Sequence, residues 1–410
     1  MSAAQDTPPA ASTPPEIAAL LAQRRPGHGL TRPFYHDPAI FARDIARIFH
    51  RHWLCVGHVS QAPAPGDWFL VRMDSEQVII ARDEAGEVHA LLNVCRHRGA
   101  EICDQPSGHT RFFVCPYHAW TYNLDGSLAA ARHMPASFDA AAHGLRRLAV
   151  RVAAGLVFIS FAEHPPAFDH VARTLQASVG RYGWDTARVA HRATYAVDAN
   201  WKLAVENYVE CYHCSPSHPE YSRLHALEQP AARIAKLNAA MEARTTALGV
   251  DVATLAAWHN DHDAEPIDCF RYALYDGVET GSESGLAVAP LMGAFTAYDG
   301  GVTSVHVGPA SFLLAYPDHG VIYRFWPRGI GRCEMELIWL VRGDAEAGRD
   351  YDPDRLTWLW RVTTDADKRI IEHTARGVAS AFFVPGPLAP MEANEARYLD
   401  WYMHELAATT

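Results

Sequence analysis

The sequence predicts an α+β protein. A small all-β domain is inserted after an N-terminal helix, and a larger domain wraps an antiparallel sheet around a long C-terminal helix, an arrangement of the helix-grip type. Three observations lead to this prediction. Short β-like runs separated by polar and Pro/Gly-rich turns fill residues 51–162. Strand-like runs follow one another between residues 302 and 341, and helical periodicity persists from about residue 353 to residue 380. Strands in sequence with helices gathered before and after them are typical of α+β folds rather than of doubly wound folds.

Composition and charge exclude several classes of protein. The chain has 410 residues, 49% of them hydrophobic and 20% charged, which is the profile of a folded globular protein long enough for two domains. Its 36 Lys and Arg against 47 Asp and Glu give a net charge of −11, which argues against a nucleic-acid or membrane partner. No apolar stretch approaches the ~20 residues that span a bilayer, and the N-terminal residues lack a secretion-signal pattern. We therefore expect a cytoplasmic protein whose 8 Cys form no disulfide framework.

The N-terminal part is expected to contain a tail, a helix and the small β domain. Residues 1–29 begin with a stretch rich in Ala, Pro, Ser and Thr and are expected to form a flexible tail. Residues 30–50 are expected to include a helix that packs on the larger domain, because apolar residues recur there at helical spacing. The β domain is expected over residues 51–162, with a hairpin at Asp125-Gly126. Its clearest strand-like runs are Phe69–Val71, Val78–Ile80 and Val88–Val94.

The larger domain is expected over residues 163–410 and combines helical and strand-like segments. Helices are expected at about residues 168–181, 200–214, 228–263, 353–380 and 391–406. Strands are expected at Val189–Val197, Val302–Val307, Phe312–Tyr316, Val321–Phe325 and Cys333–Val341.

The small domain contains two Cys-His pairs that indicate a metal cluster. Cys95-x-His97 is followed by Cys115-x2-His118. Two Cys and two His can bind either a tetrahedral zinc ion or a [2Fe–2S] cluster. Zinc fingers usually pair like with like, whereas each segment here contributes one thiolate and one imidazole, as a Rieske cluster requires. The spacing therefore favours a Rieske [2Fe–2S] cluster bound by Cys95, His97, Cys115 and His118.

The segment Trp53–Leu128 resembles the Rieske domain of the Rieske non-haem iron oxygenase α subunits. The boxes Cys-x-His-Arg-Gly, starting at Cys95, and Cys-x-Tyr-His-x-Trp, starting at Cys115, carry this resemblance. Ala119 departs from the family, which more often has Gly at this position, and we expect the added methyl group to leave the ligands untouched. Because a Rieske domain delivers electrons, the long remainder of the chain is expected to receive them.

A second metal site is indicated near the middle of the chain. Large apolar residues recur at helical spacing over residues 200–214, so we expect one amphipathic helix that presents Glu210 and His213 on the same face. Pro216 is expected to end this helix, and His218 follows in the next turn. Two His and one further carboxylate would form the facial triad of a mononuclear non-haem Fe(II) centre, although a His-x4-His spacing alone is weak evidence.

The long C-terminal helix offers the missing carboxylate. Asp367 lies in the middle of a mostly apolar stripe that includes Trp360 and Ile371, whereas Asp365 projects to the other side together with several arginines. A carboxylate within an apolar face is costly unless a cation meets it. We therefore expect Asp367 to complete the iron site and Asp365 to be solvated.

The larger domain is similar to Rieske oxygenases that attack quaternary ammonium compounds, namely glycine betaine, stachydrine and carnitine. The segment from Glu206 to Pro219 and the tail from residue 339 to residue 402 carry this likeness, which covers nearly the whole chain after residue 30. It implies that His213, His218 and Asp367 bind the mononuclear Fe(II) and that Glu210 is the bridging acid of the family. At residues 373, 374 and 383 the chain departs from this subgroup, with His, Thr and Phe, so the substrate can differ from the named betaines.

The resemblance also implies a mechanism and a set of partners. A separate NAD(P)H-dependent reductase, with flavin or an iron–sulfur centre, feeds electrons to the cluster. The electrons then pass to the iron of a neighbouring subunit, through His118 of one chain and Glu210 and His213 of the next, within a homotrimer. O2 is activated at that iron, and a C–H bond of a small-molecule substrate is hydroxylated. We expect N-demethylation of a small quaternary ammonium compound.

A quaternary ammonium group forms no hydrogen bonds, so its pocket is expected to be aromatic. Cys211 and Cys214, which flank His213, are expected to be free thiols in apolar packing rather than metal ligands. The aromatic residues available for such a pocket are Tyr208, Tyr212, Phe325, Trp326, Phe382 and Phe383.

Two alternative functions remain open at this stage. An oxygenase of the same fold that hydroxylates an aromatic ring or an aromatic acid would also have an apolar, aromatic pocket. A non-enzymatic Rieske electron carrier would bind the iron of the cluster but no further iron. Formaldehyde release from methylammonium compounds separates the first alternative from N-demethylation, and iron and sulfide analysis separates the second.

Overall fold

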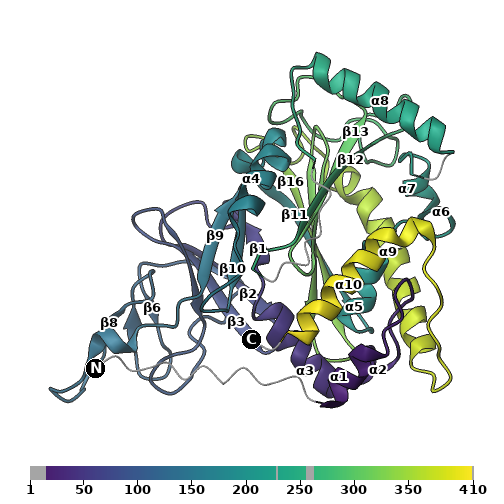
Figure 1. Ribbon diagram of the computed structural model, residues 1–410. Coiled ribbons are helices and arrows are strands. Elements are labelled where there is room, and N and C mark those ends of the chain that lie inside the picture. The colour runs from purple at the N-terminus through teal and green to yellow at the C-terminus, as the bar shows by residue number, and fades with distance from the viewer. Residues whose placement is uncertain (1–14, 228–229, 255–262, 409–410) are drawn as a thin grey trace.

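A computed structural model describes residues 15–227, 230–254 and 263–408 of the chain. It confirms the α+β prediction. Figure 1 shows the small β domain, in purple to blue, beside a larger domain whose sheet is flanked by helices. Every pair of neighbouring strands in the named sheets of the described residues is antiparallel.

The N-terminal segment packs against the larger domain. Ile17 of the first helix is only 3% exposed and belongs to the main core, so the packed part of the chain begins before residue 30, earlier than the sequence suggested. Asp37 starts the third helix, since its carboxylate accepts the N–H of Ala39 at 2.7 Å. The elements of this segment are α1 (Pro15–Ala22), α2 (Pro33–His36), α3 (Pro38–Asp44) and a π-helical turn, η1 (Ile45–Phe49).

The small domain contains three sheets, with strand orders β1-β10-β9, β4-β3-β2-β5 and β6-β7-β8. The predicted hairpin is present between β7 and β8, where Gly126 adopts a φ of 87° and the carboxylate of Asp125 accepts the N–H of Ser127 at 2.9 Å. The strands are β1 (Leu54–His58), β2 (Asp67–Met73), β3 (Glu76–Arg82), β4 (Val88–Leu92), β5 (Ser107–His109), β6 (Phe113–Val114), β7 (Thr121–Tyr122), β8 (Leu128–Ala130), β9 (Ala149–Ala153) and β10 (Leu156–Ser160).

The larger domain is built on a six-stranded sheet with the order β11-β16-β15-β14-β13-β12. Five of these strands were predicted. The sixth, β12, was missed because Asp268 and Arg271 interrupt its apolar pattern, and Arg271 is accommodated by an ion pair with Asp299. The strands are β11 (Arg188–Val197), β12 (Ile267–Ala273), β13 (Gly301–Val307), β14 (Ser311–Ala315), β15 (Gly320–Pro327) and β16 (Cys333–Val341).

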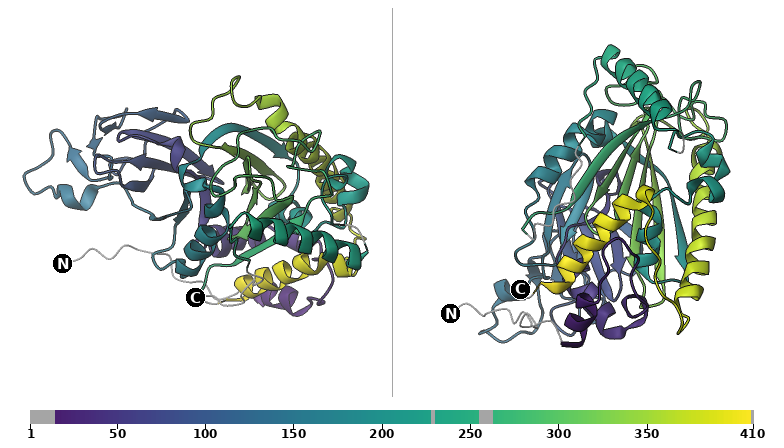
Figure 2. Two further views of the ribbon diagram at one scale, coloured as in Figure 1. Left: turned by 90° about the horizontal axis from the view of Figure 1, so that it is seen from above. Right: turned by 45° about the vertical axis from the view of Figure 1, so that its right-hand side comes forward.

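Helices cover the sheet and its ends. The long helix α9 runs alongside the strands and contacts β11, α5 and α7, as both views of Figure 2 help to show. Asp352 caps its first turn by accepting the N–H of Asp354 at 2.8 Å, and Pro353 occupies the first helical position. The helices are α4 (Asp169–Ala177), α5 (Trp201–Tyr208), α6 (Cys214–Ser217), α7 (Pro219–Ser222), α8 (Ala231–Ala247), α9 (Pro353–Val378) and α10 (Ala393–Ala407).

The single helix predicted over residues 200–214 is wrong. The helix α5 ends at Tyr208, and a short irregular segment separates it from α6. The carboxylate of Glu210 accepts the N–H of Tyr212 and, at 3.4 Å, that of His213. These side-chain bonds replace the main-chain bonds that a continuous helix would need. Pro216, which was expected to end the helix, lies inside α6 instead.

Buried polar contacts join the small domain to the larger one. His52, which is fully buried, contacts Glu265 at 3.0 Å and Glu405 at 3.3 Å. Although burial lowers the pKa of His52, the two carboxylates outweigh it and raise that pKa to about 9. Arg324 donates to the carbonyl oxygen of Cys55 at 3.2 Å. The two domains are therefore held in one arrangement by charged as well as apolar contacts.

No helix among residues 15–227, 230–254 and 263–408 is long and apolar enough to cross a membrane. The longest of them, α9, has 26 residues, but Arg361, Asp365 and Arg369 give it a polar, exposed side. This amphipathic pattern is that of a helix lying on the surface of a sheet.

Candidate active site

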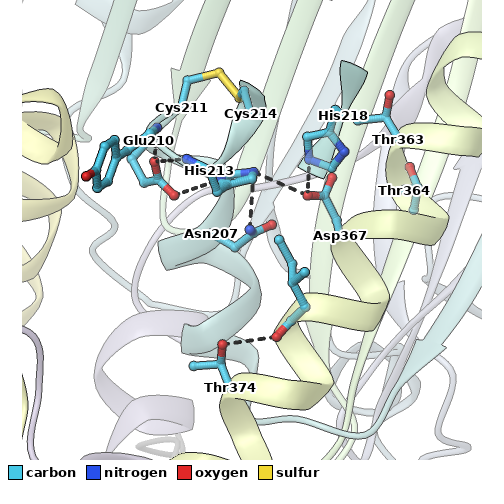
Figure 3. Close-up of polar contacts among 12 residues, drawn as sticks. Asn207, Glu210, Cys211, His213, Cys214, His218, Thr363, Thr364, Asp367 and Thr374 are labelled. Carbon is cyan, nitrogen blue, oxygen red and sulfur yellow. Dashed lines mark hydrogen bonds and ion pairs between the residues drawn. A yellow bond between two sulfur atoms is a disulfide. The ribbon is translucent and has the colours of Figure 1, made fainter. Parts of the chain in front are cut away.

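Three side chains converge beside the sheet of the larger domain, as Figure 3 shows. His213, His218 and Asp367 each offer one ligand atom, and these atoms all lie within 4.8 Å of one another. Nε2 of His218 is 2.8 Å and Nε2 of His213 is 3.4 Å from Oδ1 of Asp367. The structure therefore brings together the three residues predicted from the sequence, two imidazoles and one carboxylate.

Local structure places each of these side chains. His213 immediately precedes α6 and His218 immediately precedes α7, so both imidazoles start short helical turns. Asp367 lies in the middle of α9, on the stripe that also buries Trp360 and Ile371. The predicted helical stripe is therefore correct, and exposed Asp365 points away from it.

The polar atoms of this cluster fit a metal ion. Asp367 is 5% exposed and His218 is 1% exposed, yet Oδ1 of Asp367 and both ring nitrogens of His218 have no hydrogen-bond partner. Although Nε2 of His218 and Oδ1 of Asp367 lie 2.8 Å apart, the angles at these atoms are not those of a hydrogen bond. Unpartnered buried polar atoms are costly. Two imidazoles and one carboxylate with open positions are the ligand set of a mononuclear non-haem iron.

The charges at the site favour a cation. Burial raises the pKa of Asp367, but the neighbouring His213 and His218 outweigh it and leave that pKa below its usual value. Burial lowers the pKa of His213, but Asp367 and Glu210 outweigh it and raise that pKa to about 9. The pocket around His213 thus stabilises positive charge, which a metal ion would supply in place of the proton.

Glu210 orients His213. Oε1 of Glu210 contacts Nδ1 of His213, so Nδ1–H donates to the carboxylate and Nε2 is directed toward Asp367. Nδ2 of Asn207 lies 3.3 Å from the same Nε2. Glu210 therefore lies beside His213 as predicted, although both residues belong to an irregular segment rather than to one helix face.

A disulfide bond spans this segment. Cys211 and Cys214, on either side of His213, are joined with a Cα–Cα distance of 4.9 Å (Figure 3). The prediction that they are free thiols is therefore wrong. The break after α5 explains the difference, because the turn through His213 brings the two Cα atoms together. The remaining six cysteines are free and buried.

A cavity of about 280 Å³ opens beside the three residues. Of the aromatic residues proposed from the sequence, only Tyr208 lines it. Tyr212 and Phe382 are exposed, and Phe325 and Trp326 are buried in the core. The aromatic rings that line the cavity are Tyr208, Tyr221, Phe270, Tyr272 and Trp360.

Two of the lining residues that were not predicted, Trp360 and Tyr221, could have been recognised from their helical spacing to the proposed ligands. Trp360 lies two helical turns before Asp367 on the same stripe, and Tyr221 follows His218 by one turn. Phe270 and Tyr272 belong to β12, which the sequence analysis did not identify as a strand.

The two Cys-His pairs of the small domain lie on two loops. Cys95 and Cys115 are buried, at 3% and 2% exposure, whereas His97 and His118 are exposed. The imidazole rings of the two histidines are 4.6 Å apart. Two buried thiols and two exposed imidazoles on neighbouring loops fit the ligand set of a [2Fe–2S] cluster, which these four side chains would hold.

Neighbouring residues shape these loops. The hydroxyl of Tyr122 lies 3.3 Å from Sγ of Cys95, and the ring of Trp120 stacks on His97 at 4.9 Å. Ala119 closes the second loop, since its N–H donates to the carbonyl oxygen of Cys115 at 3.0 Å. Its φ of 56° lies in the left-handed region that favours glycine. The Cβ of Ala119 therefore strains the backbone rather than the ligands.

Comparisons with known proteins identify both domains. Residues 52–149 match the Rieske [2Fe-2S] domain, and residues 184–408 match the catalytic domain of ring hydroxylating alpha subunits. The glycine betaine monooxygenase oxygenase subunit of Chromohalobacter salexigens is 35% identical, over 96% of this chain and 89% of that protein. The carnitine monooxygenase oxygenase subunit of Acinetobacter baumannii is 35% identical, over 46% of this chain and 52% of that protein.

A solved structure supports the fold. The quaternary ammonium Rieske monooxygenase studied for carnitine oxidation by gut microbiota superposes with a TM-score of 0.71 and 22% identity, over 95% of this chain and 98% of that chain. Naphthalene 1,2-dioxygenase from Rhodococcus superposes with a TM-score of 0.65 and 18% identity, over 97% of this chain and 99% of that chain. At these identities the likeness concerns the fold alone.

Proposed function

The chain belongs to the Rieske non-haem iron oxygenase α subunits, and on this premise we propose that it is the terminal oxygenase that removes a methyl group from a small quaternary ammonium compound. The observation that carries the proposal is the convergence of His213, His218 and Asp367 on a cavity lined by aromatic rings. The relatives that act on glycine betaine and carnitine support the same substrate class.

The chain would hold two iron centres. Cys95, His97, Cys115 and His118 would bind the [2Fe–2S] cluster. His213, His218 and Asp367 would bind the mononuclear iron. When bound, the cluster supplies electrons one at a time and the mononuclear iron supplies the activation of O2.

The residues around the cavity would position the substrate. Aromatic faces attract a trialkylammonium group, because the quadrupole of each ring presents negative charge to the cation. The rings of Tyr208 and Trp360 line the same cavity as His218 and Asp367, so they would hold an N-methyl carbon next to the iron ligands. Hydroxylation of this carbon yields a carbinolamine, which collapses to formaldehyde and the demethylated amine. The apolar lining also excludes water from the reacting carbon.

Electrons would reach the iron from a neighbouring subunit. In Figure 1 the loops around β6 and β8 lie on one side of the folded molecule, and α6, α7 and α9 lie on the opposite side. We therefore infer a head-to-tail homotrimer in which His118 of one chain approaches Glu210 and His213 of the next. The electrons would come from NADH or NADPH through a separate reductase that contains flavin or an iron–sulfur centre.

The test is formaldehyde release by the purified, iron-loaded protein with a surrogate reductase and NADH. Glycine betaine, stachydrine, carnitine and choline are offered separately, and reactions without NADH or O2 serve as controls. The proposal requires formaldehyde in proportion to NADH oxidation with at least one compound. If no methylammonium compound releases formaldehyde, while an aromatic substrate is consumed, the chain is an aromatic-ring or aromatic-acid oxygenase instead.

A further inference from the structure

We propose that the substrate of this cavity is a quaternary ammonium cation without a carboxylate group, so that its net charge is positive. This inference rests on the proposed function and narrows its substrate class. It separates the chain from relatives that are named for glycine betaine and carnitine, both of which carry a carboxylate as well as the ammonium group.

The charges that line the cavity carry the inference. Among the described residues that line it there is no lysine and no arginine. Its carboxylate and imidazole side chains are Glu210, His213, His218 and Asp367. The two carboxylates would balance the charge of the divalent metal ion that His213, His218 and Asp367 would hold. A carboxylate of the substrate would therefore enter an apolar cavity without a positive side chain to pair with, which is costly.

The cations on β12 and α5, two elements that line the cavity, are paired with carboxylates outside the lining. Arg271 lies between Phe270 and Tyr272 on β12, and adjacent strand residues face opposite sides of a sheet. Its guanidinium binds Asp299 at 2.5 Å. On α5, which supplies Tyr208, the lysine is Lys202. Lys202 is 1% exposed and forms an ion pair with Asp44, away from the cavity.

Arg397 approaches the rim without entering the lining. Its guanidinium binds the side-chain oxygen of Asn394, which does line the cavity, and lies 3.7 Å from Oδ2 of Asp268. The side chain of Arg397 is also 50% exposed. Its charge is therefore shared with a carboxylate and with solvent, which weakens its attraction for an anion inside the cavity.

The polar groups that remain in the lining suit an uncharged tail. The hydroxyl groups of Tyr221 and Tyr272 bind each other at 2.9 Å, and the hydroxyl of Thr363 donates to the carbonyl oxygen of Leu359 at 2.8 Å. Ser304, on β13, contributes a further hydroxyl to the lining. Neutral groups of this kind can bind a substrate hydroxyl or amide, but they do not neutralise a carboxylate.

The experiment compares substrates that differ only in the charged tail. Glycine betaine and its amide share the trimethylammonium group and the carbon skeleton, and choline adds a hydroxyl tail. We expect kcat/KM for the amide and for choline to exceed that for glycine betaine at least about tenfold. Titration calorimetry without reductase gives the Kd of each compound in the absence of turnover, and the same order is expected.

The inference is overturned if glycine betaine is bound and demethylated as well as its amide, or better. Failure of the proposed function is a different result, namely that neither these three compounds nor stachydrine and carnitine release formaldehyde or bind, and this result overturns the inference as well. Binding and turnover of glycine betaine as good as those of its amide therefore contradict the inference alone, whereas the absence of binding and turnover with every methylammonium compound contradicts the proposed function as well.

Two variants test the charge argument within the protein. Ser304→Lys adds a cation to the cavity, and Ser284→Lys adds the same charge at an exposed serine outside it. Ser304→Lys is expected to raise the ratio of kcat/KM for glycine betaine to that for its amide at least about tenfold, and Ser284→Lys to leave it unchanged. Should Ser304→Lys not fold, Asn394→Lys places the cation at the half-buried rim. An unchanged ratio in a folded cavity variant contradicts the inference.

Discussion

His213 illustrates how two carboxylates define the role of one imidazole. Glu210 binds its Nδ1 and Asp367 faces its Nε2, so the ring has one orientation. Glu210 also accepts the main-chain N–H groups of Tyr212 and His213, which ties the carboxylate to the loop that carries the ring. A single glutamate therefore shapes the backbone and orients the proposed ligand.

Replacing Asp367 by Ala should remove the mononuclear iron and leave the Rieske cluster intact. The carboxylate is the anionic member of the proposed triad, and the two imidazoles alone bind Fe(II) weakly. We expect the visible Rieske spectrum to persist, the iron content to fall by one atom per chain, and turnover to be lost. Asp365→Ala, two residues away on the exposed side of α9, is the control and should keep both iron and activity. Retained turnover in Asp367→Ala would show that the triad is misassigned.

Replacing Glu210 by Gln should affect electron transfer more than iron binding. The amide retains the size of the side chain but not the charge that, in the proposed electron route, would bridge toward a neighbouring cluster. We expect both iron centres to be retained and the oxidation of the reduced Rieske cluster in a single turnover to slow at least about tenfold. Glu220→Gln, in the nearby helix α7, is the matched control. Equal rates in Glu210→Gln and the wild-type protein would remove Glu210 from the electron route.

At the scale of single elements, helical and strand periodicity predicted most of the structure. The stripe on α9 identified Asp367, because a carboxylate among apolar residues stands out in a regular helix. The same reasoning failed over residues 209–213. There the side chain of Glu210 accepts main-chain N–H groups that a continuous helix would use. The spacing of apolar residues contains no information about such a side-chain hydrogen bond. The Cys211–Cys214 disulfide follows from this break and was missed with it.

The contact between α5 and α10 should make stability depend on pH. Burial, followed by the nearby Glu206, raises the pKa of Glu395 to about 9, and burial raises the pKa of Glu206 to about 7, although Tyr35 donates to it at 2.8 Å. A carboxyl group that keeps its proton only in the folded state is neutral at low pH and opposes folding as the pH rises. Stability should therefore fall between about pH 4.5 and pH 9.

Glu395→Gln tests this dependence, since the amide stays neutral at every pH. We expect its Tm to equal that of the wild-type protein near pH 4.5 and to exceed it by several degrees near pH 9. The exposed Glu163, replaced by Gln, is the control and should follow the wild-type curve. Parallel curves for Glu395→Gln and the wild-type protein would mean that the carboxyl is ionised in the folded state.

At the scale of the whole molecule, contiguous motifs were easier to predict than assembled surfaces. Cys95, His97, Cys115 and His118 lie in two short segments, so their spacing alone indicated the cluster. The cavity, in contrast, is assembled from α5, α7, α9 and β12, and its aromatic lining depends on how these elements pack. One-dimensional periodicity contains little information about such packing, which explains why Tyr208 alone was identified.

The separation of the two sites within one chain leads to the last prediction. The loops around β6 lie at one end of the molecule and α9 lies at the other (Figure 1), which is consistent with the proposal that the cluster of one subunit serves the iron site of the next. Chains with His118→Ala lack a proposed ligand of the cluster, and chains with Asp367→Ala lack a proposed ligand of the mononuclear iron. Each variant alone should be inactive. Co-expressed at equal levels, they should form mixed trimers in which about one interface in three joins an intact cluster to an intact iron site.

We therefore expect mixed trimers of the His118→Ala and Asp367→Ala chains to recover up to about a third of wild-type formaldehyde release, because each closed ring of this kind contains one productive interface. Two different affinity tags, used in succession, isolate mixed oligomers and exclude contaminating homo-oligomers. Rings in which both kinds of chain carry both substitutions are the control and should stay inactive. If mixed oligomers form but show no turnover, the electron passes within one chain, because every chain in the mixture lacks one of the two centres.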